Sequence, residues 1–189
     1  EDVTPHTQYE EKVATLLDAV VNQLNFRWNL KKVYLINYSY DAAGQKKEAT
    51  NDFLNILNQG ALITNYFGHG SKTEWAAEGL LKSSYISRLS NKGRYTILNS
   101  FSCTVARFDE GKGRSLTEEF LVASNVGSIA SVGATRETFG AENRAFGTNV
   151  MVSALGESGI TYGEAYLKAK RSLDPIHKYS STRYNNERY

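Results

Sequence analysis

Four short runs of apolar residues recur along the sequence and divide it into regular sections. These runs occupy residues 32–38, 61–67, 95–101 and 127–133. Their apolar residues are continuous rather than alternating with polar ones, which is typical of strands that are buried on both faces. Because such strands occur in parallel sheets covered by helices, the runs predict a three-layer α/β domain with a mainly parallel sheet.

Helices are predicted between and around these runs. Residues 8–27 and 49–57 carry apolar side chains at helical spacing, so that one stripe of each helix faces a core. Gly60 follows the second of these helices and is expected to end it, because glycine readily adopts the conformation of a helix C-terminus. Two further helices are predicted over 84–91 and 142–156.

Two Ser/Thr-x-x-Glu sequences mark the starts of the remaining helices. Ser115 with Glu118, and Thr161 with Glu164, can form capping boxes in which the side chains bond otherwise unpaired backbone N–H groups. The helices that they open are predicted to occupy 115–124 and 161–173.

Composition fits one compact domain and argues against several classes of protein. The chain has 189 residues, of which 41% are hydrophobic and 22% are charged, which is enough to bury a core. The net charge is only +2 and the basic residues are scattered, so no nucleic-acid partner is expected. No apolar run approaches the roughly 20 residues of a membrane-spanning helix, so no transmembrane segment is expected.

The single cysteine and one of the three histidines each follow a predicted strand. His69 lies between two glycines after strand 61–67, and Cys103 lies after strand 95–101. Their separation of 34 residues suits one strand–helix–strand crossover, and the strands of such a crossover are often neighbours. Both side chains would then leave the sheet at its carboxyl edge, where ligands bind in open α/β sheets.

A thiol and an imidazole at one sheet edge suggest nucleophilic catalysis. The imidazole of His69 can take the proton of the Cys103 thiol and later protonate a leaving amine. Attack on an amide also needs an oxyanion hole, for which the backbone N–H groups of Gly70 and Cys103 are candidates. The alternative is that Gly68 and Gly70 serve a strand-end turn, that His69 is a solvated loop residue, and that Cys103 is a small core residue.

The residues around His69 and Cys103 resemble the gingipain-type family in the caspase-like clan of cysteine peptidases. The His-Gly block is NYFGHGSKTEW, and the cysteine block is NSFSCTVARFDE followed by SLTEEFL and GSIASVGATRE. The cysteine block looks most like the family members that serve type IX secretion in Bacteroidota. The resemblance covers the chain from about residue 30 to its end. It implies a His69–Cys103 catalytic dyad, with the N–H groups of Gly70 and Cys103 at the oxyanion positions.

The same resemblance implies a function and a setting. The protein would be a cysteine endopeptidase or transpeptidase that acts on polypeptides, secreted or on the outer surface of a bacterium, with secretion-system components as candidate partners. No cofactor is required, and no residue pattern supports a structural calcium ion. Residues 1–189 would form one subdomain of a larger catalytic domain, whose first strand and preceding subdomain lie outside this sequence. The third catalytic residue of gingipains has no counterpart that can be placed here.

Further residues near the sheet edge have two interpretations each. Trp75 lines the substrate cleft or covers the sheet edge, and the resemblance favours the cleft. Arg136 follows strand 127–133 and meets a substrate carboxylate or forms a surface ion pair of little energetic consequence. Arg107 and Asp109 brace the cysteine loop as a pair or are two solvated charges. The glycine-rich loop 109–115 does not match a phosphate-binding motif, and a solvated loop over the cleft is expected there.

Two rival functions stay open at this point. The first is a catalytically silent, gingipain-like scaffold or binding module that retains the dyad without a pocket. The second is a flavodoxin-like ligand-binding domain unrelated to proteolysis.

Overall fold

The chain divides into two compact units, each with its own internal packing. The computed structural model describes residues 15, 18–19 and 28–173. Of these residues, Lys31–Thr138 form the first unit, and 139–173 belong to the second unit together with 15, 18–19 and 28–30. Most of the helix predicted over 8–27 lies outside the described residues, of which only 15 and 18–19 fall in this range and are helical.

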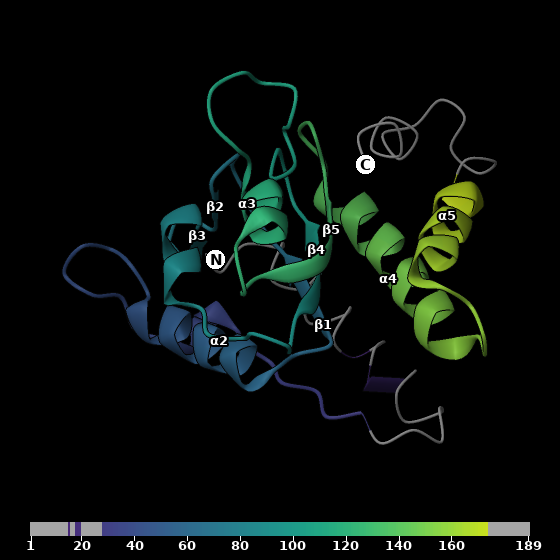
Figure 1. Ribbon diagram of the computed structural model, residues 1–189, viewed down its shortest axis with the longest axis horizontal. Coiled ribbons are helices and arrows are strands. Elements are labelled where there is room, and N and C mark those ends of the chain that lie inside the picture. The colour runs from purple at the N-terminus through teal and green to yellow at the C-terminus, as the bar shows by residue number, and fades with distance from the viewer. Residues whose placement is uncertain (1–14, 16–17, 20–27, 174–189) are drawn as a thin grey trace. The chain divides into compact units, whose positions relative to one another are not determined.

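A parallel three-stranded sheet forms the centre of the first unit (Figure 1). Its strands are β1 (Ile63–Phe67), β4 (Thr96–Phe101) and β5 (Ser128–Gly133), in the order β1-β4-β5. All three were predicted as continuous apolar runs, and their parallel pairing agrees with the predicted α/β class. The register pairs Phe67 with Phe101, so β1 and β4 end side by side and their following loops start together.

The strand predicted over 32–38 is wrong. Residues Leu35–Asn37 form a 3₁₀ turn, η1, in which the N–H groups of Asn37 and Tyr38 bond the carbonyls of Tyr34 and Leu35. Val33 and Leu35 of this run are partly buried against the core, whereas Ile36 is 60% exposed. Apolar content therefore indicated only part of the burial, and it could not report whether a neighbouring strand supplies hydrogen bonds.

A small hairpin was not predicted from the sequence. Strands β2 (Glu74–Trp75) and β3 (Leu81–Lys82) pair antiparallel, with Trp75 opposite Leu81. An isolated bridge also joins Gly70 to Trp75. Strands of two residues are too short to show a period, so no pattern could have predicted them.

Helices and turns of the first unit follow the predicted positions closely. Helix α2 (Lys47–Gln59) ends at Gly60, whose φ of 100° favours glycine. The helix predicted over 84–91 is the 3₁₀ helix η2 (Ser83–Arg88). Helix α3 (Leu116–Val122) opens with the predicted capping box, in which Ser115 and Glu118 satisfy each other's backbone N–H groups.

The second unit contains a packed pair of helices. They are α4 (Gly140–Gly156) and α5 (Tyr162–Leu173), and the rings of Phe146 and Tyr166 meet edge to face with centroids 5.3 Å apart. The capping box predicted at the start of α5 is present, because the Thr161 hydroxyl and N–H both donate to Glu164, at 2.7 and 2.8 Å.

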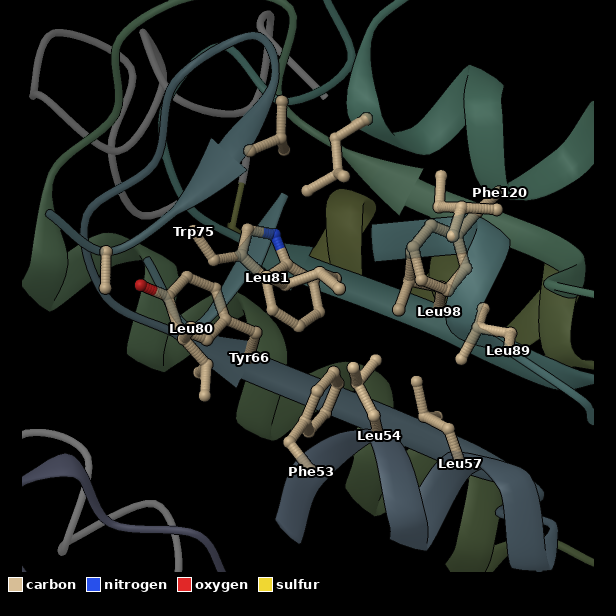
Figure 2. Packing of buried hydrophobic residues seen from close by; sticks show 14 of the residues in the cluster. Phe53, Leu54, Leu57, Tyr66, Trp75, Leu80, Leu81, Leu89, Leu98 and Phe120 are labelled. Atoms are coloured by element: carbon tan, nitrogen blue, oxygen red, sulfur yellow. The ribbon is translucent and has the colours of Figure 1, made fainter. Parts of the chain in front are cut away.

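The hydrophobic core of the first unit connects the sheet to α2, α3 and the hairpin (Figure 2). Each element contributes large side chains that are at least nine-tenths buried: Phe53, Leu54 and Leu57 from α2; Tyr66 and Leu98 from the sheet; Trp75 and Leu81 from the hairpin; Leu116 and Phe120 from α3. Full burial of one such side chain contributes about 1.5–3 kcal/mol. This core holds the ends of β1 and β4 in place, and the candidate site lies just beyond them.

Candidate active site

The loops that carry His69 and Cys103 touch each other. Each begins directly after its strand, because Phe67 and Phe101 are partners in the sheet register. A β-carbon added to Gly70 would lie 2.0 Å from Oγ of Ser102 and 3.2 Å from the carbonyl oxygen of Cys103. The predicted adjacency of the two strands is therefore correct, and the absence of a side chain at Gly70 lets the loops approach this closely.

The His69 loop is held from the core side by two hydrogen bonds to one carbonyl. The hydroxyl of Tyr66 donates to the carbonyl oxygen of His69 at 2.6 Å, and the N–H of Ala76 donates to the same oxygen at 2.9 Å. The Tyr66 ring lies flat against the Trp75 ring, with centroids 4.3 Å apart and planes 6° from parallel (Figure 2). Backbone placement of His69 thus derives from core residues, while its own residue surface is exposed.

Position 68 needs a glycine for a steric reason that differs from the one at Gly70. A β-carbon at this position would lie 2.6 Å from the Tyr66 hydroxyl oxygen. That hydroxyl is the donor to the His69 carbonyl, so a larger residue at Gly68 would displace it. The two glycines that flank His69 therefore serve different contacts, one with Tyr66 and the other with the cysteine loop.

The Cys103 loop is bonded to the segment that follows β5. The N–H of Thr104 donates to the carbonyl of Arg136, and the N–H of Ala106 donates to the carbonyl of Ala134, both at 3.0 Å. Thr104 has a φ of 54°, which is uncommon for a threonine and marks a sharp turn directly after Cys103. Cys103 is a half-buried free cysteine, which differs from a fully buried core residue.

Trp75 does not line a cleft, which corrects the interpretation favoured by the resemblance. Its side chain is 0% exposed and packs between Tyr66 and Phe53, whose ring centroid lies 5.7 Å from its own. The alternative interpretation, cover for the sheet edge, describes its position. Its indole N–H is buried without a hydrogen-bond partner, so packing rather than polar bonding holds the ring.

Arg136 pairs with Asp109 rather than standing alone at the sheet edge. The guanidinium Nη1 and Nη2 lie 3.0 and 2.5 Å from the two carboxylate oxygens, which is a bidentate geometry. The hydrogen bond from Arg136 lowers the pKa of Asp109 below its usual range. The predicted Arg107–Asp109 pair is wrong, because Asp109 pairs with Arg136. Nε of Arg107 instead lies 3.8 Å from Oε2 of Glu110.

Lys72, three residues after His69, anchors the loop 107–114 that follows the cysteine. Its ammonium group donates to the carbonyl oxygens of Glu110 and Lys112, at 3.0 and 2.7 Å. The carbonyl of Lys72 also accepts the N–H of Leu116, at the start of α3. Lys72 was not predicted from the sequence, because one lysine after a glycine motif carries no distinguishing pattern.

The described residues were searched for metal-binding clusters and for membrane-spanning helices. Within 28–173 and the three described positions before it, no group of three or more His, Cys, Asp or Glu side chains could hold a metal ion. In the same part of the chain, no helix has the length and apolarity needed to cross a membrane.

Comparison with known proteins identifies a family and a fold for this chain. Residues 2–189 match the model of the family described as Peptidase family C25. Lys-gingipain W83 of Porphyromonas gingivalis is 30% identical over 112 residues, which cover 56% of this chain, and a second Lys-gingipain of that species is 27% identical over 112 residues. The chain spans only 6% of the length of these relatives.

Two solved structures share the fold. One is the Arg-specific cysteine proteinase gingipain R, with a TM-score of 0.75 and 16% identity over 97% of this chain and 40% of that chain. The other is the complex of the pro- and mature domains of RgpB from Porphyromonas gingivalis, with a TM-score of 0.73 and 17% identity over 96% of this chain and 41% of the other. The predicted gingipain-like, caspase-like fold is therefore confirmed, as part of a larger domain.

Proposed function

Because the chain belongs to peptidase family C25, the gingipain-type family of cysteine peptidases, we propose that it carries a Cys103–His69 dyad that cleaves peptide bonds. One observation supports this most strongly. Gly70 brings the histidine loop against the cysteine loop, with the Cys103 carbonyl 3.2 Å from the position of an added β-carbon. A flavodoxin-like binding domain would have no need for this contact between a histidine loop and a cysteine loop.

In the proposed first step, His69 takes the proton of the Cys103 thiol. The thiolate sulfur then attacks the carbonyl carbon of the scissile peptide bond, and the π electrons of that carbonyl move onto its oxygen. The N–H groups of Gly70 and Cys103 stabilise the resulting oxyanion. When the carbonyl reforms, the C–N bond breaks, and the imidazolium of His69 gives its proton to the departing amine.

In the proposed second step, the thioester on Cys103 is opened. A water molecule gives up a proton to His69 as its oxygen attacks the thioester carbon. The C–S bond then breaks and His69 returns the proton to the sulfur, which releases a carboxylic acid and regenerates the thiol. An amine that attacks in place of water would form a new amide bond instead, which is a transpeptidation. The same groups serve both outcomes, and the difference lies only in which nucleophile reaches the thioester.

We further propose that the protein is a PorU-like component of type IX secretion, at the outer surface of a bacterium or secreted from it. The motif resemblance around Cys103 supports this assignment. Its substrate would be a polypeptide with a carboxy-terminal secretion signal, and other secretion components would be partners. Residues 1–189 would then be one subdomain of a larger catalytic domain, consistent with the 40% of gingipain R that the chain covers.

Labelling of Cys103 tests the peptidase against the silent scaffold. The full-length protein is treated with a panel of peptidyl acyloxymethyl ketones and, in parallel, with iodoacetamide, and Cys103 modification is measured by peptide mass spectrometry. A peptidase should react with at least one peptidyl reagent much faster than a small-molecule thiol does. If no peptidyl reagent exceeds that control, and Cys103→Ala leaves all peptide cleavage intact, the protein is not a Cys103 peptidase.

A further inference from the structure

Three polar atoms of one residue surround the sulfur of Cys103. The N–H of Thr138 donates to Sγ at 3.4 Å, and the Thr138 hydroxyl oxygen lies 3.8 Å from Sγ. The thiol in turn lies 3.5 Å from the carbonyl oxygen of Thr138, to which it can donate when protonated. Thr138 is 9% exposed, so these atoms face the sulfur from a largely enclosed position.

The position of Thr138 is set by the segment 134–138, which follows β5 along the cysteine loop. Backbone hydrogen bonds from Thr104 and Ala106 reach the carbonyls of Arg136 and Ala134, both at 3.0 Å. The side chain of Arg136 adds the bidentate contact with Asp109, further along the same loop. Thr138 therefore meets Cys103 in a fixed register.

We infer that Thr138 is a positioning residue for the nucleophile, which holds the Cys103 sulfur and stabilises its thiolate through the Thr138 N–H and hydroxyl groups. This inference rests on the proposed role of Cys103 as the nucleophile. A thiol can donate to the Thr138 carbonyl, whereas a thiolate can only accept, from the N–H and from the hydroxyl after it rotates. The hydroxyl therefore shifts the balance toward the thiolate, and it is the one group that a substitution can remove.

The charged groups near Cys103 do not change when this hydroxyl is removed. His69 lies on the loop after β1, Arg107 and Asp109 lie on the cysteine's own loop, and Arg136 and Glu137 lie on the segment after β5. Asp109 and Arg136 bond each other. A neutral substitution at Thr138 therefore alters the donors to the sulfur while every neighbouring charge stays in place.

The test is the pH dependence of Cys103 alkylation by iodoacetamide in the full-length protein, followed on the Cys103 peptide by mass spectrometry. Thr138→Val keeps the shape and the N–H but loses the hydroxyl, whereas Thr138→Ser keeps the hydroxyl. We expect Thr138→Val to alkylate about threefold to tenfold more slowly below the midpoint of the profile, because one unit of pKa corresponds to tenfold. The rate at the high-pH plateau should be unchanged, and Thr138→Ser should follow the wild-type profile.

The inference is overturned if Thr138→Val and the wild type share one midpoint. Should Thr138→Val melt at a much lower temperature, Thr138→Ala provides a second variant without the hydroxyl, and it is held to the same expectation. Iodoacetamide needs no peptidase activity, so this test is independent of the peptidyl labelling. If Thr138→Val shifts the midpoint of the alkylation profile as expected but no peptidyl reagent labels Cys103 faster than the control, the proposed peptidase function is rejected. The effect of Thr138 on the Cys103 sulfur is then retained.

Discussion

Replacement of Gly70 by alanine places a methyl group between the two site loops. The added carbon would lie 2.0 Å from Oγ of Ser102, 2.9 Å from Cγ1 of Val105 and 3.2 Å from the carbonyl oxygen of Cys103. Oγ of Ser102 is buried without a hydrogen-bond partner, so it can rotate away without breaking a bond. Val105 is 0% exposed and Cys103 contributes backbone, so neither can give way as cheaply.

The expected loss in the free energy of unfolding for Gly70→Ala follows from overpacking where the two loops meet. Inserting a methyl group into a well-packed region costs about 1–3 kcal/mol. Taking a value of about 2 kcal/mol and a urea m value of roughly 2 kcal/mol/M, the unfolding midpoint should fall by about 1 M. Relief of the clash would displace the Cys103 loop, so peptide cleavage should fall by a larger factor than stability alone explains.

Urea denaturation monitored by tryptophan fluorescence measures the first effect, and kcat/KM toward a cleaved peptide measures the second. Gly111→Ala is the matched control, because a β-carbon there meets nothing within 4 Å, and its cost should stay within about 0.5 kcal/mol. In a double-mutant cycle, Ser102→Ala should reduce the cost of Gly70→Ala by removing the nearest atom. If Gly70→Ala matches Gly111→Ala in both assays, the close approach of the loops is not as described.

Three further substitutions test other contacts of the first unit. Tyr66→Phe removes the donor to the His69 carbonyl and should cost about 1 kcal/mol in urea denaturation, with a loss of kcat at unchanged KM; an unchanged kcat would show that this bond does not position His69. Ser115→Ala removes half of the α3 capping box and should lower the free energy of unfolding by about 1 kcal/mol. An unchanged free energy of unfolding would show that water replaces the cap without cost. Asp109→Asn should lower the melting temperature at neutral pH, and this difference should shrink as the pH falls below about 4. The reason is that Arg136 lowers the pKa of Asp109, so the stabilisation is present above about pH 4 and is lost as the pH falls through the lowered value. A constant difference across this range would contradict the ion pair.

The sheet was predictable because each of its strands lies in a short run rich in apolar residues and bounded by turns. The same signal failed at Leu35–Asn37, where apolar residues pack on the core as a 3₁₀ turn. Hydrophobic pattern reports burial, whereas strand formation also needs a neighbour to accept and donate hydrogen bonds. The two-residue strands of the hairpin carry no periodicity, and they appear only when Trp75 is seen opposite Leu81.

The candidate site was predictable to the level of its two loops. Spacing and topology placed His69 and Cys103 after neighbouring parallel strands, and the register of β1 and β4 agrees. The residues around the sulfur were not predictable in the same way. Thr138 lies 35 residues beyond Cys103, and its contact depends on the path of the chain after β5. Trp75 was misplaced because a tryptophan near a motif fits both a cleft and a core.

The central claim is that Cys103 forms a covalent acyl intermediate with the help of His69. Its most direct measurement is acid quench of the full-length protein during turnover of a peptide substrate, followed by the mass of the Cys103 peptide. We expect an adduct on Cys103 with the mass of the acyl part of the substrate. This adduct should form far more slowly in His69→Ala at neutral pH, and no cleavage should remain in Cys103→Ala. Cleavage that persists in Cys103→Ala, or an adduct that forms equally fast without His69, would contradict it.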